Sequence, residues 1–236
     1  LHWQRTATVP ALTITVAAID GGGRSVAMTT GDPAYGALPV AALPIGRAVA
    51  DPRFLQLPAV LPSGPLRIVL IVTKGGDHLA PIALGVVQVQ DRQHTFTPPP
   101  SQYPLSATFG GQIALLGYDL PTTTVQPGGP LPITFHWQAL QTPTHNYTVF
   151  VHLLDARGQI AAQNDSQPAA GTLPTLGWLP REVLTDQHMV PLPPSLPAGA
   201  YHFEIGWYDA TTNQRLTLGT PPGADSLVLP QVITVR

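Results

Sequence analysis

The sequence contains no cysteine. Disulfide bonds, thiolate zinc sites and cysteine nucleophiles are therefore excluded. Charged residues are also scarce, at 10% of the chain, and Lys74 is the only lysine. The net charge is −2 and basic residues form no run, whereas nucleic-acid-binding domains present a basic field. We therefore expect no nucleic acid among the partners of this protein.

Long apolar runs are absent as well. The longest, residues 66–72, is interrupted by Arg67 and is much shorter than the roughly 20 residues that a membrane-spanning helix needs. The chain begins with Leu1 instead of Met and shows no signal peptide. We therefore expect a fragment from which any targeting or membrane segment has been removed.

Proline and glycine are abundant, with 28 and 22 residues, and hydrophobic residues make up 44% of the chain. Proline and glycine interrupt helices, so little room is left for long ones, and the apolar content is sufficient for a core. Between the prolines and glycines, apolar and polar residues alternate with a period of two, most clearly in residues 12–18, 147–154 and 201–208. This alternation is typical of β-strands, so the sequence predicts an all-β fold.

The chain is also a tandem repeat. Residues 12–72 align without a gap to residues 147–207 when residue n is matched with residue n + 135. The clearest matched pairs are Asp20 and Asp155, Gly36 and Gly171, Asp51 and Asp186, Leu57 and Leu192, and Gly64 and Gly199. Near the N-terminus, LHWQ of residues 1–4 matches FHWQ of residues 135–138 with a shift of 134. Self-similarity over so long a period indicates a duplicated structural unit.

We therefore predict two tandem antiparallel β-sandwiches of the immunoglobulin-like or jelly-roll-like kind, spanning residues 1–93 and 106–236. Between them, residues 94–105 contain three consecutive prolines, which favour a stiff, extended linker. The second copy begins with a strand at residues 113–120 that has no counterpart in the first copy. The first sandwich is therefore expected to lack its leading strand, which leaves an unpaired edge unless a neighbour supplies a strand.

Histidines form the most suggestive chemical cluster, since motifs of nucleotide binding, serine hydrolases and zinc proteases are not found. His136, His152 and His202 lie opposite the apolar phase of their strands, and Glu204 shares the phase of His202. If these strands are neighbours in one sheet, the four side chains can converge as zinc ligands do. The alternative is that they are ordinary polar residues of an outer sheet face.

Four aspartates are retained in both copies as the pairs Asp20 with Asp155 and Asp51 with Asp186. Loop carboxylates of this kind can hold a structural calcium ion. An aspartate beside glycine is also a common turn-former that bonds nearby backbone N–H groups. Both interpretations are open from the sequence.

Tryptophans on apolar strand faces are expected to be core residues; these are Trp3, Trp137 and Trp207. Trp178 differs, because it follows the loop-like residues 171–177 and the other copy carries Leu43 at the matched position. It either stacks on a sugar ring, with Tyr208 or Tyr118 as further ligand-binding residues, or plugs the end of the sandwich.

Several segments of the second copy carry a family resemblance: residues 113–119 (IALLGYD), 135–137 (FHW), 147–155 (YTVFVHLLD), 165–168 (DSQP), 174–178 (PTLGW), 199–201 (GAY) and 208–209 (YD). This pattern resembles a β-sandwich repeat of Chloroflexi-type bacteria. That repeat typically follows a multi-pass membrane glycosyltransferase of the dolichyl-phosphate-mannose mannosyltransferase-like kind. The resemblance covers residues 113–235 and, more weakly, residues 1–89, where Leu43 stands for Trp178 and Ala17 for His152.

The resemblance implies a non-catalytic, extracytoplasmic module attached to the membrane domain of a larger parent protein, with glycan or cell-envelope polymers as candidate ligands. It implies no cofactor and assigns no site residues. One alternative is a purely structural spacer or protein-interaction module. Another is a metal-dependent hydrolase centred on the histidine cluster.

Overall fold

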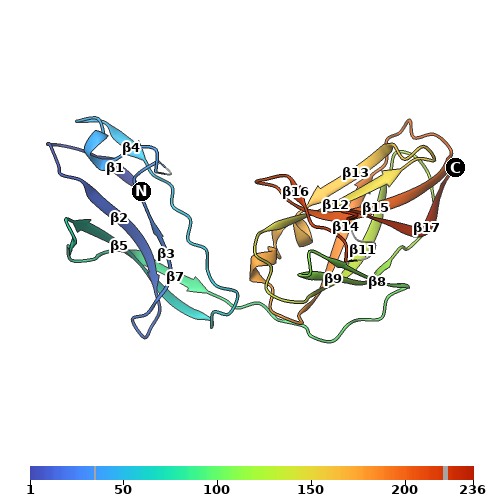
Figure 1. Cartoon of the computed structure of the whole chain (residues 1–236), viewed down its shortest axis with the longest axis horizontal. Helices are drawn as coiled ribbons and strands as arrows, with labels where there is room; N and C mark the ends of the chain where they lie inside the picture. Colours follow the sequence, from blue (N-terminus) through green and yellow to red (C-terminus); the bar gives the residue numbers. More distant parts are fainter. Residues whose placement is uncertain (35, 220–222) are drawn as a thin grey trace. The chain divides into compact units, whose positions relative to one another are not determined.

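Short β-strands account for most of the regular structure in the computed structural model, which describes residues 1–34, 36–219 and 223–236. Three short 3-10 helices complete the regular elements of these residues, so the protein is all-β, as predicted. The chain forms two units, Leu1–Arg92 (unit 1) and Gln93–Arg236 (unit 2), shown in Figure 1. No helix within the described ranges has the length and apolar character needed to cross a membrane.

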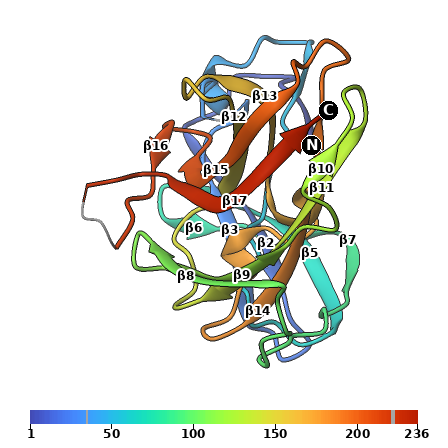
Figure 2. The ribbon, with the colours of Figure 1, turned by 90° about the vertical axis from the view of Figure 1, so that its right-hand side faces the viewer.

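Unit 2 is a sandwich of two sheets. The four-stranded sheet has the order β14 (Val183–Pro191), β11 (Pro130–Ala139), β9 (Ile113–Asp119) and β8 (Tyr103–Phe109). The other sheet has the order β10 (Thr124–Val125), β17 (Leu227–Val235), β15 (Gly199–Asp209), β12 (Tyr147–Leu154) and β13 (Ile160–Ser166), with β16 (Gln214–Arg215) paired to β15. Figure 2 shows β17 beside β15 in this six-stranded sheet. Pairing is antiparallel except between β10 and β17, which are parallel.

Three tryptophans occupy the centre of the core between these sheets. The ring of Trp207 lies 4.9 Å from that of Trp137 and 5.8 Å from that of Trp178, both edge to face. This geometry is favoured between aromatic rings. Trp137 and Trp207 point inward because they occupy the apolar phase of β11 and β15, while Trp178 enters from the segment after the 3-10 helix η3 (Thr175–Gly177). All three are fully buried.

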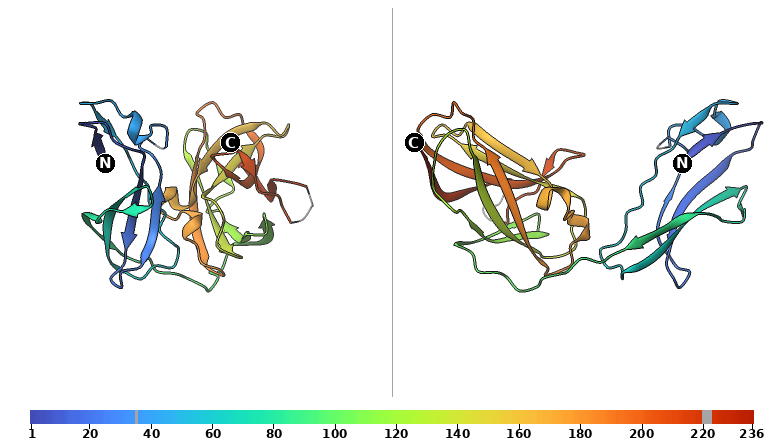
Figure 3. Two further views of the ribbon diagram at one scale, coloured as in Figure 1. Left: turned by 60° about the vertical axis from the view of Figure 1, so that its left-hand side comes forward. Right: turned by 180° about the vertical axis from the view of Figure 1, so that it is seen from behind.

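Unit 1 contains a larger and a smaller sheet, both visible in Figure 3. The larger has the order β3 (Ser25–Thr30), β2 (Leu12–Ile19), β5 (Gly64–Lys74) and β6 (Asp77–His78), with β7 (Ile82–Val89) also paired to β5. The smaller consists of β1 (His2–Gln4) and β4 (Ala48–Ala50). Its core is smaller than that of unit 2 and divides into two clusters, one around Ile14 and Leu43 and one around Ala18 and Leu66.

Matched elements of the two units begin at matched residues. β2 begins at Leu12 and β12 at Tyr147, while β5 begins at Gly64 and β15 at Gly199, each with the shift of 135. The 3-10 helix η1 (Val40–Ala42) corresponds in the same way to η3. The repeat in the sequence is therefore also a repeat in strand register.

The two units differ most at β1 and β11. β11 pairs with β14 on one side and with β9 on the other, whereas in the described part of unit 1 β1 pairs only with β4. Counterparts of both β8 and β9 are missing from these residues. The sequence predicted one missing strand, at residues 113–120 of the second copy. The second missing strand is the counterpart of β8, which begins inside the predicted linker and ends at Phe109, beyond it.

Residues 94–105, predicted as that linker, are bonded to unit 2. His94 Nδ1 lies 2.9 Å from Glu182 Oε1, and the Gln102 N–H donates to Asp119 Oδ1 at 2.6 Å. β8 then begins at Tyr103, ahead of the predicted start of the second sandwich. The three prolines lack an N–H group, but their flanking residues supply the hydrogen bonds that hold the segment in place.

Candidate functional site

A polar pocket of about 270 Å³ lies on the outer face of the six-stranded sheet of unit 2. Its lining residues are Phe150 and His152 on β12, Asp165 on β13, Tyr208 on β15, Arg215 on β16, and Asn213. Strand register explains why they meet: Phe150 is opposite Asp165, and Tyr208 is opposite Arg215. Directly opposed residues project from the same face of a sheet.

Phe150 forms the floor of the pocket although it points away from the core. Its ring is only 1% exposed, because Gly206 on the neighbouring strand leaves room for it. A Cβ atom at Gly206 would lie 2.3 Å from the Phe150 ring. The Arg215 guanidinium covers the ring at 4.4 Å from its centroid, a cation–π contact. Arg215 also donates to Asp225 at 3.3 Å, which holds the guanidinium over the floor.

His152 lies between two carboxylates at the edge of the pocket. Its Nε2 is 3.5 Å from Asp165 Oδ1, and its Nδ1 is 3.4 Å from Glu204 Oε2. These separations are long for hydrogen bonds. Glu204 accepts a shorter bond from Ser226 Oγ at 2.8 Å. The pocket therefore holds negative charge around a nearly buried imidazole.

Tyr208 stays protonated beside this charge. Burial, followed by the Asp165 carboxylate, raises the pKa of Tyr208 above its ordinary value. Since that ordinary value is near 10, the phenol keeps its hydrogen at neutral pH. The phenol donates to the Asp165 carboxylate, so its oxygen can accept a hydrogen bond from a ligand.

The pocket combines hydrogen-bond donors and acceptors in a small space. Asp165 can only accept when ionised, Arg215 can only donate, and Asn213 and Tyr208 can do both. A few convergent polar groups above an apolar floor are typical of small-molecule sites. The lining residues suit hydrogen bonding to a compact polar ligand better than covalent catalysis, which needs a nucleophile next to a base.

The four predicted metal ligands do not come together. His152 and Glu204 are directly opposed on β12 and β15, and His202 lies on the same sheet. His136 is on β11 in the other sheet, where its Nε2 lies 2.8 Å from Asp119 Oδ2. The prediction that the three histidine-bearing strands are neighbours in one sheet was wrong, because the chain passes from one sheet to the other between β11 and β12. Across residues 1–34, 36–219 and 223–236, no group of three His, Asp or Glu side chains is placed to hold a metal ion.

Of the three predicted ligand-binding aromatic residues, only Tyr208 lines the pocket. Trp178 is fully buried and its Nε1 donates to the Leu173 carbonyl at 3.0 Å, so it is the plug of the sandwich. Tyr118 is also fully buried and stacks on Tyr103 with ring centroids 5.2 Å apart. The prediction that a sugar stacks on Trp178 or Tyr118 is therefore wrong, because neither ring has an accessible face.

Asp20 and Asp155 close hairpin turns. Asp155 Oδ1 accepts from the N–H groups of Arg157 at 2.8 Å and Gln159 at 2.9 Å, and Asp20 Oδ1 accepts from the equivalent groups two and four residues further on. The bond from the Arg24 N–H is the main reason that the pKa of Asp20 is lowered. This geometry fits the turn-forming interpretation, since the oxygens face backbone donors of their own turn.

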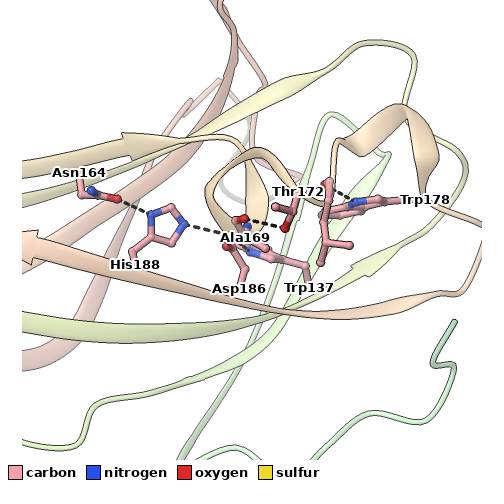
Figure 4. A network of polar contacts seen from close by, with 8 residues as sticks. Trp137, Asn164, Ala169, Thr172, Trp178, Asp186 and His188 are labelled. Atoms are coloured by element: carbon pink, nitrogen blue, oxygen red, sulfur yellow. Dashed lines mark hydrogen bonds and ion pairs between the residues drawn. The ribbon is translucent and has the colours of Figure 1, made fainter. Parts of the chain in front are cut away.

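Asp186 is the centre of a buried network in unit 2, drawn in Figure 4. Its carboxylate accepts from Trp137 Nε1 at 3.2 Å, from the Ala169 N–H at 2.8 Å, and pairs with His188 Nε2 at 2.9 Å. His188 Nδ1 in turn lies 2.8 Å from Asn164 Oδ1. The network ties both sheets to the segment that follows β13.

Asp51 repeats this arrangement in unit 1. It accepts from Trp3 Nε1 at 2.8 Å, from the Ala34 N–H at 3.1 Å and from Arg53 Nε at 2.9 Å. Both aspartates are fully buried. Because N–H donors surround their oxygens, the pair forms a structural anchor, and a calcium ion would have to displace these donors.

The pocket occupies positions at which the two copies diverge. Unit 1 carries Thr15, Ala17, Thr30 and Thr73 at the positions matched to Phe150, His152, Asp165 and Tyr208. Sequence reasoning singled out His152 and Tyr208 but missed Phe150, Asp165, Asn213 and Arg215. These residues could have been found by comparing the two copies. The outward-facing strand positions differ between the copies, whereas the turn and anchor aspartates are retained.

The chain is thus a tandem all-β protein with a polar pocket on its second sandwich. No protein-family model matches the chain, and no curated protein matches it.

Proposed function

We propose that this chain is a non-catalytic, extracytoplasmic module of a larger, membrane-anchored, glycosyltransferase-like bacterial protein, and that unit 2 binds carbohydrate of the cell envelope in the Phe150–Arg215 pocket. The polar lining of the pocket and the sequence resemblance both support this proposal. Its parent protein and its location rest on the resemblance.

The divergence between the two copies is the observation that carries the binding role. The anchor aspartates, the turn aspartates and the strand register are shared. The pocket residues are not, and Thr15 and Thr30 instead bond each other through their hydroxyls at 2.8 Å. A scaffold kept in both copies, with polar and aromatic side chains gathered on one of them, favours a ligand site on that copy.

Sugar hydroxyls match the chemistry of the pocket. Asp165 can accept from two vicinal hydroxyls, while Arg215 and Asn213 donate to ring or hydroxyl oxygens. Arg215 already covers the Phe150 ring, so hydrogen bonds contribute more than stacking. Because the pocket is open and small, we expect a dissociation constant of about 1 mM, or about 4 kcal/mol of binding free energy.

The test is an NMR titration of the full chain with a panel of neutral and amino sugars and their short oligomers. We expect shifts at the backbone amides of residues 150, 152, 165, 208 and 215. Asp165→Asn should weaken binding at least about tenfold, because a charge-assisted hydrogen bond contributes roughly 1.5–3 kcal/mol. Thr30→Ala, at the matched position of unit 1, is the control and should leave the affinity unchanged.

Flat titrations across the panel would contradict carbohydrate binding and would favour the spacer or protein-interaction module. Shifts confined to unit 1, or binding that survives Asp165→Asn unchanged, would contradict the pocket as the site.

A further inference from the structure

Among the described residues of unit 1, β1 pairs with β4 on one side and has a free edge on the other. Leu1 and Asp51 exchange both backbone hydrogen bonds, at 2.9 and 2.8 Å. In an antiparallel pair, N–H groups alternate between the two edges of a strand, so those of His2 and Gln4 point away from β4. At the matched position of unit 2, His136 is opposite Gly117 of β9.

Unit 1 also exposes an apolar side chain of β7 whose counterpart in β17 is buried. Val87, opposite Leu66, is 50% exposed, while Ile233, opposite Tyr201, is 0% exposed. Trp3 is half-buried and borders a hollow of about 170 Å³ with apolar walls.

In unit 2 the hairpin β8–β9 covers the equivalent region. Phe109, at the end of β8, lies edge to face with Trp137 at 6.0 Å, and Ile113 and Leu115 of β9 are fully buried. These inward side chains occupy the side of the sandwich that unit 1 leaves open.

A polar contact points to the same missing element. Asp119, at the end of β9, pairs with His136 at 2.8 Å. His2 occupies the matched position in β1 and is exposed. The first copy therefore retains the histidine that, in the second copy, meets a carboxylate of the hairpin.

We propose that unit 1 is completed by a β-hairpin of the β8–β9 kind, joined to the chain ahead of β1. The hairpin pairs with the free edge of β1, places a large apolar side chain over Trp3 and presents a carboxylate to His2. This inference is independent of the carbohydrate site, because the pocket lies on the other unit.

Chain connectivity selects this source. In unit 2 the hairpin leads into β11 through the short connection 120–129, so it enters from the N-terminal side. The amino group of Leu1 already lies in ladder position against the Asp51 carbonyl. A second copy of the chain is a weaker donor, because its own hairpin is paired with β11 within unit 2.

The test joins a copy of residues 102–134 directly to Leu1, since Leu1 matches Phe135. We expect amide hydrogen exchange at His2 and Gln4 to slow at least about tenfold relative to the chain without the extension. The extended chain should remain monomeric in analytical ultracentrifugation. The matched control carries Phe109→Asp and Leu115→Asp in the grafted copy only and should show no slowing.

A second readout separates specific docking from general stabilisation. The imidazole NMR signals of His2 should shift in the extended chain because the new carboxylate lies beside the ring, and Asp119→Asn in the grafted copy should remove most of this change. Unchanged exchange at His2 and Gln4 in the extended chain would overturn the proposal. So would slow exchange in the unextended chain that appears only with dimer formation, which would identify a second copy as the occupant.

Discussion

Trp3 and Trp137 occupy matched positions, donate to matched aspartates and lie on strands of identical register, but they differ in burial. Trp137 is fully buried, whereas Trp3 is half-buried. The local hydrogen bond is the same, at 2.8 Å in unit 1 and 3.2 Å in unit 2. The comparison shows that the anchor sets the register of the strands, while the β8–β9 hairpin determines how completely the core is covered.

The outer faces of the two units give a second comparison. Gly206 admits the Phe150 ring in unit 2, while unit 1 carries Ile71 and Thr15 at the matched positions. One scaffold therefore supports an aromatic-floored pocket or a plain strand surface, depending on a few outward side chains.

Trp178→Ala should give the largest effect. It removes a fully buried indole from the centre of the core and should destabilise unit 2 by about 3–5 kcal/mol. Leu43→Ala at the matched position should cost unit 1 less, about 2–3 kcal/mol, because a smaller side chain is lost. Urea unfolding followed by tryptophan fluorescence and circular dichroism measures both, with Trp3→Phe used to isolate the signal of unit 2. A loss below about 1 kcal/mol for Trp178→Ala would contradict the plug.

Asp186→Ala tests the anchor. Its removal leaves the buried donors of Trp137 and Ala169 without an acceptor, which should cost about 3 kcal/mol. Asp51→Ala should cost about 2 kcal/mol, because the half-buried Trp3 can reach water and the Arg53 guanidinium keeps the Gly31 carbonyl as an acceptor. The same unfolding experiment measures both losses. Equal losses of stability in the two units would argue against the difference in burial between Trp3 and Trp137.

Gly206→Ala tests the floor of the pocket. The added methyl group meets the Phe150 ring, so that ring must move, and we expect a loss of about 2 kcal/mol together with loss of ligand-induced shifts. Ile71→Ala, at the matched position of unit 1, serves as the control. It removes side-chain volume from unit 1 and should leave the pocket of unit 2 unchanged. Retained NMR shifts in the Gly206→Ala variant would place the ligand elsewhere.

The smallest expected effect is the contribution of the Asp119 charge to the stability of unit 2, which depends on pH. Burial opposes ionisation, but hydrogen bonds from the Gln102 N–H and His136 lower the pKa of Asp119 below its ordinary value. Its contribution to stability is therefore present above about pH 4 and is lost as the pH falls through the lower folded-state value. Since a third of the side chain is exposed, we expect less than about 1 kcal/mol.

Acid unfolding of Asp119→Asn checks this contribution. The variant should be less stable than the parent at pH 7, and the difference should shrink below about pH 4. A difference that is constant over this range would assign the loss to packing instead of charge.

The sequence was sufficient for the all-β fold and the repeat, because strand alternation and turn residues are local signals that recur at a fixed spacing. It was insufficient for β8, because the prolines at residues 98–100 favoured an extended linker over residues 94–105, where β8 begins. It also placed His136 with His152, since alternation reveals the phase of a strand but not the sheet to which that strand belongs. Arg215 and Asp165 were missed because their proximity depends on the pairing of β12, β13, β15 and β16.

Amide-resolved hydrogen exchange of the unmodified chain tests the central comparison most directly. We expect fast exchange for His2 and Gln4, whose N–H groups face the free edge of β1, and slow exchange for His136 and Gln138, whose N–H groups face β9. Trp3, which faces β4, should exchange more slowly than His2. Equal protection of His2 and His136 in the monomeric chain would show that β1 is already paired on both sides, and would contradict the open edge of unit 1.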